Sequence, residues 1–399
     1  MSKMTINMSC GQTSLYPEAL RALSEQICQP IYYPEYWGTE IAVIDMLRQI
    51  AGTKNEVLLI TGSATYGEEA AIMSILERGE KILTVNTGMY GRVLTDLADI
   101  TGAKPVELKI EEGRSVSAQM IREKLAADPK IKMVAVVYAD TSQGTVNPIR
   151  EIGDMMKEFP DVLLMVDAVS ALAAMPLCVD DWRIDVLCTS TQKCVNAPQG
   201  QAIVMVSDRV WDTIKKRKTP IMSLCMDLTV WKDYHDGVRK AYESGSWSDI
   251  STATTKAIHG PSPSYSLVRA AKASLEAILA EGLEHVYHRH EVASKAVREA
   301  VRALGLAVKA ADDSIAAPMT TTIVFPPDVE WTPLAREMLE RHGIALAAGF
   351  RIGNMGLVAD PRYVIPTIAA LEETMATLGH EVEMGAGVRA AQKVFAKEW

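Results

Sequence analysis

The chain has 399 residues, 48% of them hydrophobic, and a formal net charge of −9. Because a single hydrophobic core stops growing at about 250–300 residues, this length predicts two domains. The acidic balance, with no basic run longer than residues 215–218, excludes the charge distribution typical of nucleic-acid-binding proteins.

The sequence lacks the signals of a membrane segment, a signal peptide, a disulfide framework and a metal site. No apolar run approaches the ~20 residues that cross a bilayer, and the first ten residues lack the apolar core of a signal peptide. Six cysteines are scattered without a C-x-x-C pair, so we expect reduced core cysteines, no disulfide framework and no metal site. These features predict a cytoplasmic protein without a membrane segment.

The first half of the chain alternates strand and helix patterns. After residues 1–15, which show little periodicity, a helix is predicted from Tyr16 to about Ile27, since Pro17 lies in its first turn. Short apolar runs predict strands at 57–60, 81–85, 134–137, 162–166, 184–188 and 201–206. This alternation predicts an α/β fold with a mostly parallel sheet covered by helices on both faces.

The composition of the chain changes at the start of its second half. Residues 222–258 carry aromatic side chains among polar ones, and we interpret them as a long loop, a candidate lid or substrate-recognition insertion. A helix is predicted over 265–280, and alternating patterns then predict a smaller α/β domain over 281–399. Three histidines near its start, His285, His288 and His290, lack the spacing of a metal site and are expected on a helix surface.

Two charged residues follow neighbouring predicted strands. Asp167 ends the run 162–166, and Lys193 follows the run 184–188. Ligands of open α/β sheets bind outside the carboxyl ends of the strands, so both side chains would face one cleft. An amine and a carboxylate placed in this way suit pyridoxal 5'-phosphate (PLP), whose aldehyde a lysine holds as a Schiff base while an aspartate keeps the pyridine nitrogen protonated.

Two further segments bear on this chemistry. The small residues after the run 57–60 lead from a strand into a helix N-terminus, an arrangement that suits a phosphate. Near the C-terminus, Arg351 offers the planar, two-pronged donor that binds a carboxylate better than lysine does.

These motifs together resemble fold-type I, class V PLP-dependent aminotransferases, the alanine–glyoxylate and serine–pyruvate aminotransferase family. The similar segments are V-D-A-V-S at 166–170, Q-K-x-x-x-A-P-x-G at 192–200, S-A-T at 63–65, D-T-S-Q-G-T at 140–145 and F-R-I-G-N-M-G at 350–356. The resemblance covers nearly the whole chain. It implies an N-terminal arm (1–15) laid over a neighbouring subunit, a large PLP-binding domain (16–280) with a mostly parallel seven-stranded sheet in which 201–206 runs antiparallel, and a small C-terminal domain (281–399).

The resemblance also implies a role for each site residue and a homodimer with shared active sites. Lys193 and Asp167 would be catalytic, and Arg351, Tyr32 and Ser142 would contact the substrate. The residues implied in cofactor binding are Ser63, Ala64, Thr65, Tyr90, Ser142, Asp167, Gln192 and Lys193, with His259 and Ser262 reaching the partner's cofactor phosphate. Ala64 stands where the family usually has glycine, and residues 345–349 form a shorter loop than usual beside the substrate.

The activity implied is transfer of an amino group from a small amino acid or amine to a 2-oxo acid such as pyruvate or glyoxylate. Residues 314–322 and Tyr32 also resemble pyridoxamine–pyruvate aminotransferase, which uses free pyridoxamine as its substrate. A PLP-dependent lyase or desulfurase of the same fold is a second alternative. A binding protein that has kept the fold and lost the reaction is a third, and the presence of Lys193 argues against it.

Overall fold

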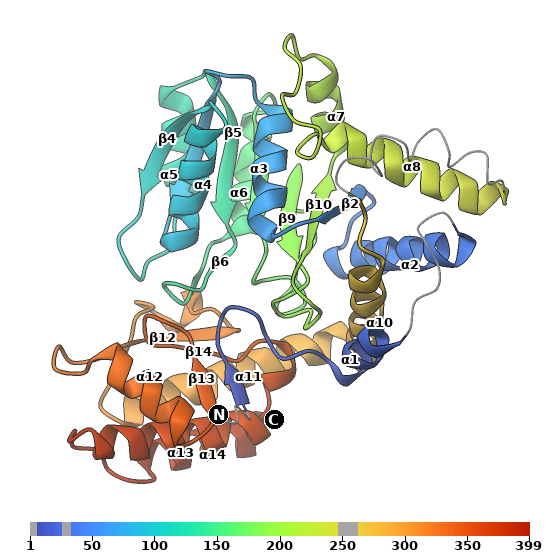
Figure 1. The fold of residues 1–399 in the computed structure, drawn as a ribbon. Helices are drawn as coiled ribbons and strands as arrows, with labels where there is room; N and C mark the ends of the chain where they lie inside the picture. Colours follow the sequence, from blue (N-terminus) through green and yellow to red (C-terminus); the bar gives the residue numbers. More distant parts are fainter. Residues whose placement is uncertain (1–5, 26–32, 246–261) are drawn as a thin grey trace.

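The computed structural model describes residues 6–25, 33–245 and 262–399. Two bodies are visible in Figure 1. The large body is a seven-stranded sheet with the helices packed on it, and the small body is a three-stranded sheet with helices α11 to α14. The division of the chain at residues 15 and 280 stays a prediction.

The seven-stranded sheet confirms the predicted topology. Its order is β2-β10-β9-β8-β5-β3-β4, and β10 runs antiparallel to both its neighbours while the other pairs are parallel. The strands are β2 (Glu56–Thr61), β3 (Lys81–Asn86), β4 (Lys104–Lys109), β5 (Ile131–Val137), β8 (Leu163–Asp167), β9 (Val186–Ser190) and β10 (Gln201–Val206).

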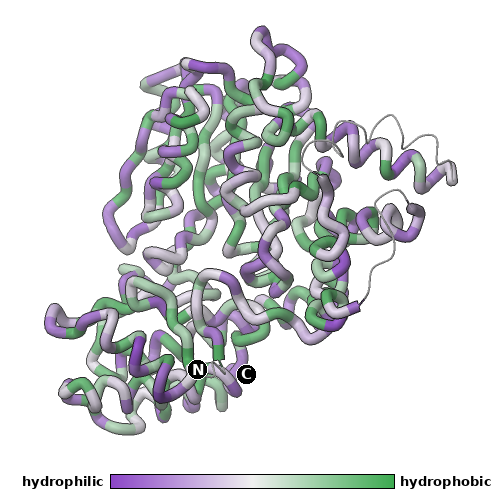
Figure 2. The backbone as a smooth tube through the Cα atoms, in the orientation of Figure 1, coloured by the Kyte–Doolittle hydropathy of each residue, from purple (hydrophilic) through white to green (hydrophobic). Residues whose placement is uncertain are grey.

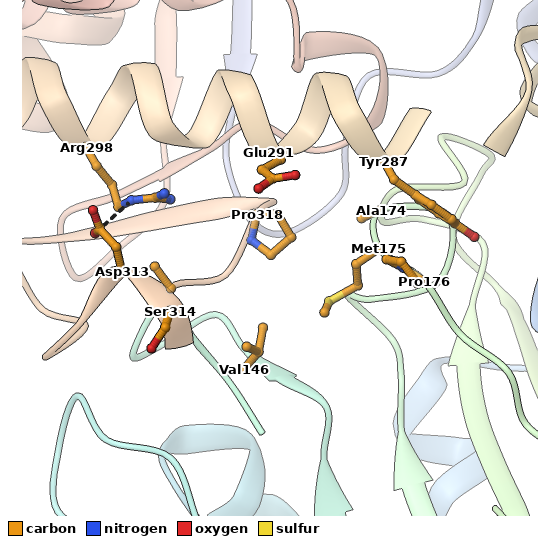
Figure 3. Close-up of a pocket in the computed structure, with 11 residues that line it drawn as sticks. Val146, Ala174, Met175, Pro176, Tyr287, Glu291, Arg298, Asp313, Ser314 and Pro318 are labelled. Carbon is orange, nitrogen blue, oxygen red and sulfur yellow. Dashed lines mark ion pairs between the residues drawn. The ribbon is translucent and has the colours of Figure 1, made fainter. Parts of the chain in front are cut away.

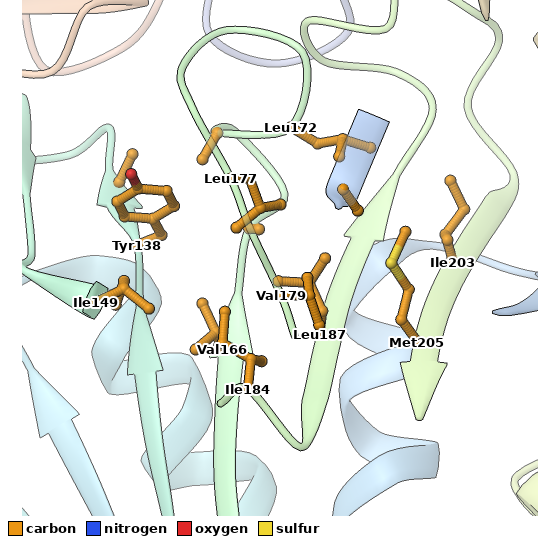
Figure 4. Close-up of a cluster of buried hydrophobic side chains, with 14 of the residues drawn as sticks. Tyr138, Ile149, Val166, Leu172, Leu177, Val179, Ile184, Leu187, Ile203 and Met205 are labelled. Carbon is orange, nitrogen blue, oxygen red and sulfur yellow. The ribbon is translucent and has the colours of Figure 1, made fainter. Parts of the chain in front are cut away.

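Both faces of this sheet are buried under helices. Successive strand residues such as Leu58 and Leu59 belong to different hydrophobic clusters, because side chains alternate between the faces of a strand. One cluster includes Val166, Leu187 and Met205 (Figure 4), and the strands are largely hydrophobic in Figure 2. Helices α3 (Ala64–Ile75), α4 (Met89–Ile100), α7 (Asp208–Lys215) and α8 (Leu228–Ser244) cover one face, and α5 (Ala118–Ala127), α6 (Ile149–Met155) and α10 (Tyr265–Glu281) cover the other.

The interpretation of residues 222–258 as a long loop was wrong for its central part, which forms α8. Asp227 caps this helix, and Trp231 and Tyr234 are fully buried against the sheet. His235 Nε2 accepts a hydrogen bond from the Leu59 N–H in β2. The helix therefore belongs to the core of the large body and is not a lid.

The N-terminal segment joins both bodies. Residues Ile6–Met8 form β1, which pairs in parallel with β13 (Ile344–Leu346) of the same chain. Helix α1 (Pro17–Ser24) begins as predicted, with proline in its first turn, and ends three residues before the predicted end. It packs beside α10 and is followed by α2 (Pro34–Ala51), which runs along the edge of the large body (Figure 1).

The small body has its own hydrophobic cluster. Its sheet has the order β11-β12-β14, and its elements are α11 (Leu283–Ala303), β11 (Ala307–Val308), β12 (Thr320–Val324), α12 (Trp331–Glu340), β14 (Arg351–Gly353), α13 (Pro361–Thr377) and α14 (Ala386–Glu398). The expected surface position of the three histidines holds for His285 and His288 but is wrong for His290. This ring is fully buried, and its Nε2 accepts a hydrogen bond of 2.8 Å from the Gly356 N–H.

A cavity of about 310 Å³ lies where the two bodies meet (Figure 3). The large body contributes Met175 and Pro176, and the small body contributes Tyr287, Arg298 and Asp313. An ion pair of 3.2 Å between Arg298 and Asp313 borders the cavity. The bodies are thus incompletely packed against each other on this side.

Within the described residues, no helix is long and apolar enough to cross a membrane, and no cluster of side chains suits a metal ion. Cys10, Cys188 and Cys194 are buried free thiols, as expected, whereas Cys178 and Cys225 are free but partly exposed.

Candidate active site

Asp167 and Lys193 lie at the same edge of the sheet. Asp167 is the last residue of β8 and pairs with Cys188 of the adjacent β9, and Lys193 lies three residues after the end of β9. The two residues are only 4% and 7% exposed. They lie at the same edge because β8 and β9 are adjacent parallel strands, whose carboxyl ends are on the same side of the sheet.

The N-terminal segment covers the lysine. Lys193 Nζ donates a hydrogen bond to the Cys10 carbonyl. Thr13 Oγ1 donates to the Lys193 carbonyl at 2.8 Å. Residues 10–13 therefore shield the amine from water, a feature that the aperiodic sequence of this segment did not reveal.

Asp167 belongs to a buried pair of carboxyl groups. Burial raises the pKa of Asp167 to about 6, and the Asp140 charge adds to this, while the Val169 N–H and the Lys193 charge oppose it. Glu68, on α3, hydrogen-bonds Asp167, and burial together with the Asp167 charge raises the pKa of Glu68 well above its ordinary value. Glu68 is thus the protonated partner, and Asp167 is the carboxylate of the pair.

The residues fit the pyridine ring of PLP, because a protonated ring nitrogen is a positively charged hydrogen-bond donor for a buried carboxylate such as Asp167. Sequence reasoning missed Glu68. Its position, four residues after Ala64 on the face of α3 that packs on the sheet, was the available signal.

The predicted phosphate residues form the start of α3. Ser63 is its N-cap, and Ser63 Oγ accepts a hydrogen bond of 3.4 Å from the Tyr66 N–H. The first turn contains no acidic residue, and the first N–H groups of a helix have no partner within it. A Cβ on Gly62 would lie 2.8 Å from Tyr66 Cγ, so the turn needs glycine there. Ser63, Ala64 and Thr65 therefore offer the N–H groups and the dipole end that suit a phosphate.

Ser262 lies beside this turn in the same chain. Its carbonyl accepts a hydrogen bond of 3.0 Å from Thr61 Oγ1, at the end of β2. Two other predicted residues, Tyr32 and His259, lie outside the described residues.

Asp140 organises the part of the site that carries Tyr90 and Ser142. Ser142 Oγ donates to Asp140 Oδ1 at 2.6 Å and accepts from the Met89 N–H at 2.9 Å, and the Tyr90 N–H donates to Asp140 Oδ2 at 3.3 Å. A Cβ on Gly88 would lie 2.6 Å from Ser142 Oγ, so glycine allows this close approach. The start of α4 is thus tied to the hairpin of β6 (Ala139–Asp140) and β7 (Thr145–Val146).

The sequence did not single out Asp140, although it opens the D-T-S-Q-G-T segment. Its burial, at 0% exposure, arises from contacts with α4, some 50 residues earlier in the chain.

Two buried polar atoms near Lys193 have no hydrogen-bond partner among the described residues. They are Ser190 Oγ and Gln192 Oε1. An unpaired buried polar group costs free energy, so such atoms mark a place where a polar ligand is accommodated. This observation agrees with the prediction that Gln192 contacts the cofactor.

Arg351 begins β14 and points toward the β6–β7 hairpin. Its Nη1 donates to Thr141 Oγ1 at 3.4 Å, and its Nε donates to the Ala348 carbonyl at 2.7 Å. The shortened loop before it is a tight hairpin in which the backbones of Ala347 and Arg351 exchange two hydrogen bonds. Phe350, held at φ 57° and packed 4.5 Å from the Phe325 ring, turns the chain into this strand. Arg351 is therefore placed by a rigid element between the two bodies.

Asn196 joins three segments around the lysine, and sequence reasoning missed it as well. Its Nδ2 donates to Thr13 Oγ1 and to the Ser14 carbonyl, each at 2.9 Å, and its Oδ1 accepts from the Leu357 N–H. It occupies an unassigned position of the Q-K-x-x-x-A-P motif, so only the three-dimensional contacts reveal its function as a link.

Comparison with known proteins gives consistent similarities along the chain. A family model for class V aminotransferases matches residues 43–357. An uncharacterized aminotransferase of Methanocaldococcus jannaschii is 31% identical over 396 residues, 97% of each chain. Pyridoxamine–pyruvate transaminase of Mesorhizobium japonicum is 30% identical over 398 residues, 98% of this chain and 96% of the relative. The crystal structure of ureidoglycine–glyoxylate aminotransferase from Bacillus subtilis matches with a TM-score of 0.88 at 28% identity, over 98% of each chain.

Proposed function

Because the chain belongs to the class V family of PLP-dependent aminotransferases, we propose that it moves the amino group of a small amino acid or amine to a 2-oxo acid such as pyruvate or glyoxylate. The observation that carries this proposal is the arrangement of three charged groups. The buried Lys193 and Asp167 lie at one sheet edge, and Arg351 reaches the loop that follows β5 from the small body.

PLP, when bound, supplies an aldehyde that combines with amines and a ring that takes up the electron pair released from the substrate Cα. Lys193 would hold the cofactor through Nζ, and its amine would act as the base that takes the proton from the substrate Cα. Asp167 would accept a hydrogen bond from the protonated ring nitrogen and balance its charge. Arg351 binds the substrate α-carboxylate and so fixes the orientation of the Cα–H bond.

The remaining predicted residues complete the site in this proposal. The N-terminus of α3, with Ser63, Ala64 and Thr65, binds the cofactor phosphate, and Tyr90 stacks on the ring. Ser142 and Gln192 add polar contacts, Tyr32 forms a wall of the substrate site, and His259 and Ser262 reach the phosphate held by the partner subunit. Support comes from the start of α3, where the first N–H groups of a helix have no partner within it, and from Gln192 Oε1, which has no hydrogen-bond partner in the part of the chain that the structure describes.

The rival functions receive less support from the site. A desulfurase needs a reactive thiol, but burial raises the pKa of Cys194, next to Lys193, to about 12, so this group stays a buried thiol at neutral pH. The helix end at Ser63 suits a cofactor that carries a phosphate.

We further propose a homodimer that shares its active sites and works in the cytoplasm. All cysteines within the described residues are free, in keeping with a reducing compartment.

The test is covalent trapping. Protein loaded with PLP and reduced with borohydride should carry the cofactor on Lys193 in peptide maps. The Lys193→Ala variant should bind PLP only reversibly. Label on another lysine, or no label at all, would overturn the assignment.

A further inference from the structure

A cleft of about 610 Å³ adjoins Arg351 and Ser142. This volume lies within the range of pockets that bind a whole small-molecule ligand. The side chain of a small amino acid such as alanine would fill only a small part of it. Besides Arg351, two charged residues line it, Lys309 and Glu112. The cleft therefore has room and charge for more than an α-carboxylate.

Lys309 and Arg351 lie in one row across the small sheet. Thr322 of β12 pairs directly with Arg351 of β14. On the other side of β12, Val308 pairs with Ile323, and the next residue, Lys309, donates its N–H to the Thr322 carbonyl at 2.9 Å. Directly opposed residues of antiparallel strands share one face, so both cations flank Thr322 on the side that lines the cleft.

The backbone at Lys309 is fixed. A Cβ on Gly113 would lie 2.2 Å from the Lys309 carbonyl, so the large body approaches closely there. The Ala311 N–H donates to the Gly113 carbonyl at 2.9 Å. Adjacent strands are about 4.8 Å apart, which places the Lys309 and Arg351 backbones about 10 Å from each other, with both long side chains able to reach one ligand between them.

Lys309 has a partner that a substrate can replace. Its Nζ lies 2.9 Å from Glu112 Oε2, and the Glu112 side chain is 79% exposed while that of Lys309 is 26% exposed. An ion pair with so exposed a carboxylate contributes little to stability and breaks readily. A carboxylate bound inside the cleft would take its place in a less solvated setting.

We propose that Lys309 is a specificity-determining residue that binds the side-chain carboxylate of a dicarboxylic amino acid while Arg351 binds its α-carboxylate. The natural donor is thus an acidic amino acid, and the corresponding 2-oxo acid occupies the same positions in the reverse direction. This inference rests on the proposed function, since it requires the substrate to enter beside Arg351.

The experiment compares each acidic amino acid with its uncharged, nearly isosteric amide. The readout is the ratio of kcat/KM for L-aspartate over L-asparagine, and for L-glutamate over L-glutamine, with glyoxylate as acceptor. One of the two ratios should favour the acid in the wild-type protein. Lys309→Met should lower that ratio about 10- to 100-fold, and Lys309→Arg should retain much of it.

Glu112→Gln is the matched control, because it removes the same ion pair and leaves the cation in place. The preference for the acid should persist or increase in this variant. An equal loss of preference in Glu112→Gln and Lys309→Met, or a wild-type protein that uses amides as well as acids, would overturn the assignment of Lys309 while leaving the aminotransferase function intact. Failure of every amino acid to transfer its amino group would instead contradict the proposed function itself.

Discussion

At the residue scale, Arg351 is held by the Ala348 carbonyl and Thr141 Oγ1, so its guanidinium is positioned before substrate arrives. A preordered, two-pronged donor gains most from a planar carboxylate. Truncation to alanine would leave the substrate carboxylate without its partner in a partly enclosed site.

Arg351→Ala should accordingly lower kcat/KM for α-amino acids by about 10- to 1000-fold, and Arg351→Lys should restore only part of the loss. Amines without a carboxylate should lose far less, and the affinity for PLP should persist. Steady-state kinetics with matched carboxylated and uncarboxylated donors checks this contrast. Equal losses for both donor types would make Arg351 a structural residue.

The Glu68–Asp167 pair has a consequence for stability without cofactor. Both carboxyl groups have a pKa raised by burial, that of Asp167 to about 6, so the folded chain binds their protons more tightly than the unfolded chain does. For an acid whose pKa is raised on folding, stability is greatest at low pH and falls as pH rises through the folded-state pKa. The pair should therefore destabilise the cofactor-free protein progressively as the pH rises from about 4, where the unfolded carboxyl groups ionise, through the folded-state pKa of Asp167 at about 6.

Glu68→Gln removes one of these groups and keeps a hydrogen-bond donor toward Asp167. We expect the cofactor-free variant to exceed the wild-type stability by about 1 kcal/mol or more at pH 7, with little difference at pH 4. Denaturant titrations at the two pH values measure this difference. Glu69→Gln, which alters the adjacent, partly exposed carboxylate, is the control and should show no such trend. A Glu68→Gln variant equally destabilised at both pH values would contradict the assignment of the shared proton.

At the scale of the elements, α3 and α5 offer a matched comparison, because each begins with a serine cap that accepts a hydrogen bond from the N–H three residues later. They lie on opposite faces of the sheet, and only the α3 N-terminus is proposed to bind the phosphate.

Ser63→Ala and Ser117→Ala should each cost about 1 kcal/mol of stability through the lost cap. Ser63→Ala should in addition weaken PLP binding about 5- to 10-fold, because a phosphate contact is lost with the hydroxyl. Equilibrium titration of the apoprotein with PLP distinguishes the two variants. A similar affinity in both would place the phosphate elsewhere.

Helices and strands were predictable from the sequence where their burial gives a simple pattern of apolar residues. The apolar runs at β8, β9 and β10 are buried on both faces and were found, as was the proline at the start of α1. Strand β4 lies at the sheet edge and is mostly exposed or half-buried, with charged residues at both ends and at Glu107, so no apolar run marks it. The apolar positions of α8 at 228, 231, 234, 238 and 241 do follow helical spacing, but the polar residues between them led to its interpretation as a loop.

At the scale of the whole molecule, the positions of Asp167 and Lys193 at the carboxyl ends of two predicted strands were enough to predict that they lie at the same sheet edge. Ligands of open α/β sheets bind at this edge. Glu68 and Asp140 were not predictable in the same way. Each acquires its role through burial against an element distant in the sequence, and a glutamate on a helix or an aspartate in a turn is usually solvated. The site thus combines motifs readable in sequence with partners that only the fold supplies.

Shared active sites in a homodimer lead to a complementation prediction. A Lys193→Ala chain and a chain with both His259→Ala and Ser262→Ala should each be inactive as homodimers. Heterodimers should recover activity, because one of their two sites has both an intact lysine and intact partner residues. Activity assays on tagged heterodimers, purified by sequential affinity steps, measure this. Heterodimers that form and stay inactive would show that these residues act within their own chain.

The central claim, amino transfer through Lys193, is tested most directly by following the nitrogen itself. Donors labelled with heavy nitrogen, L-alanine and L-aspartate among them, are incubated with glyoxylate and the PLP-loaded protein, and the products are analysed by mass spectrometry. We predict that the label appears in glycine and that Lys193→Ala abolishes the transfer. Label released as ammonia, or transfer that survives the loss of Lys193, would contradict the account.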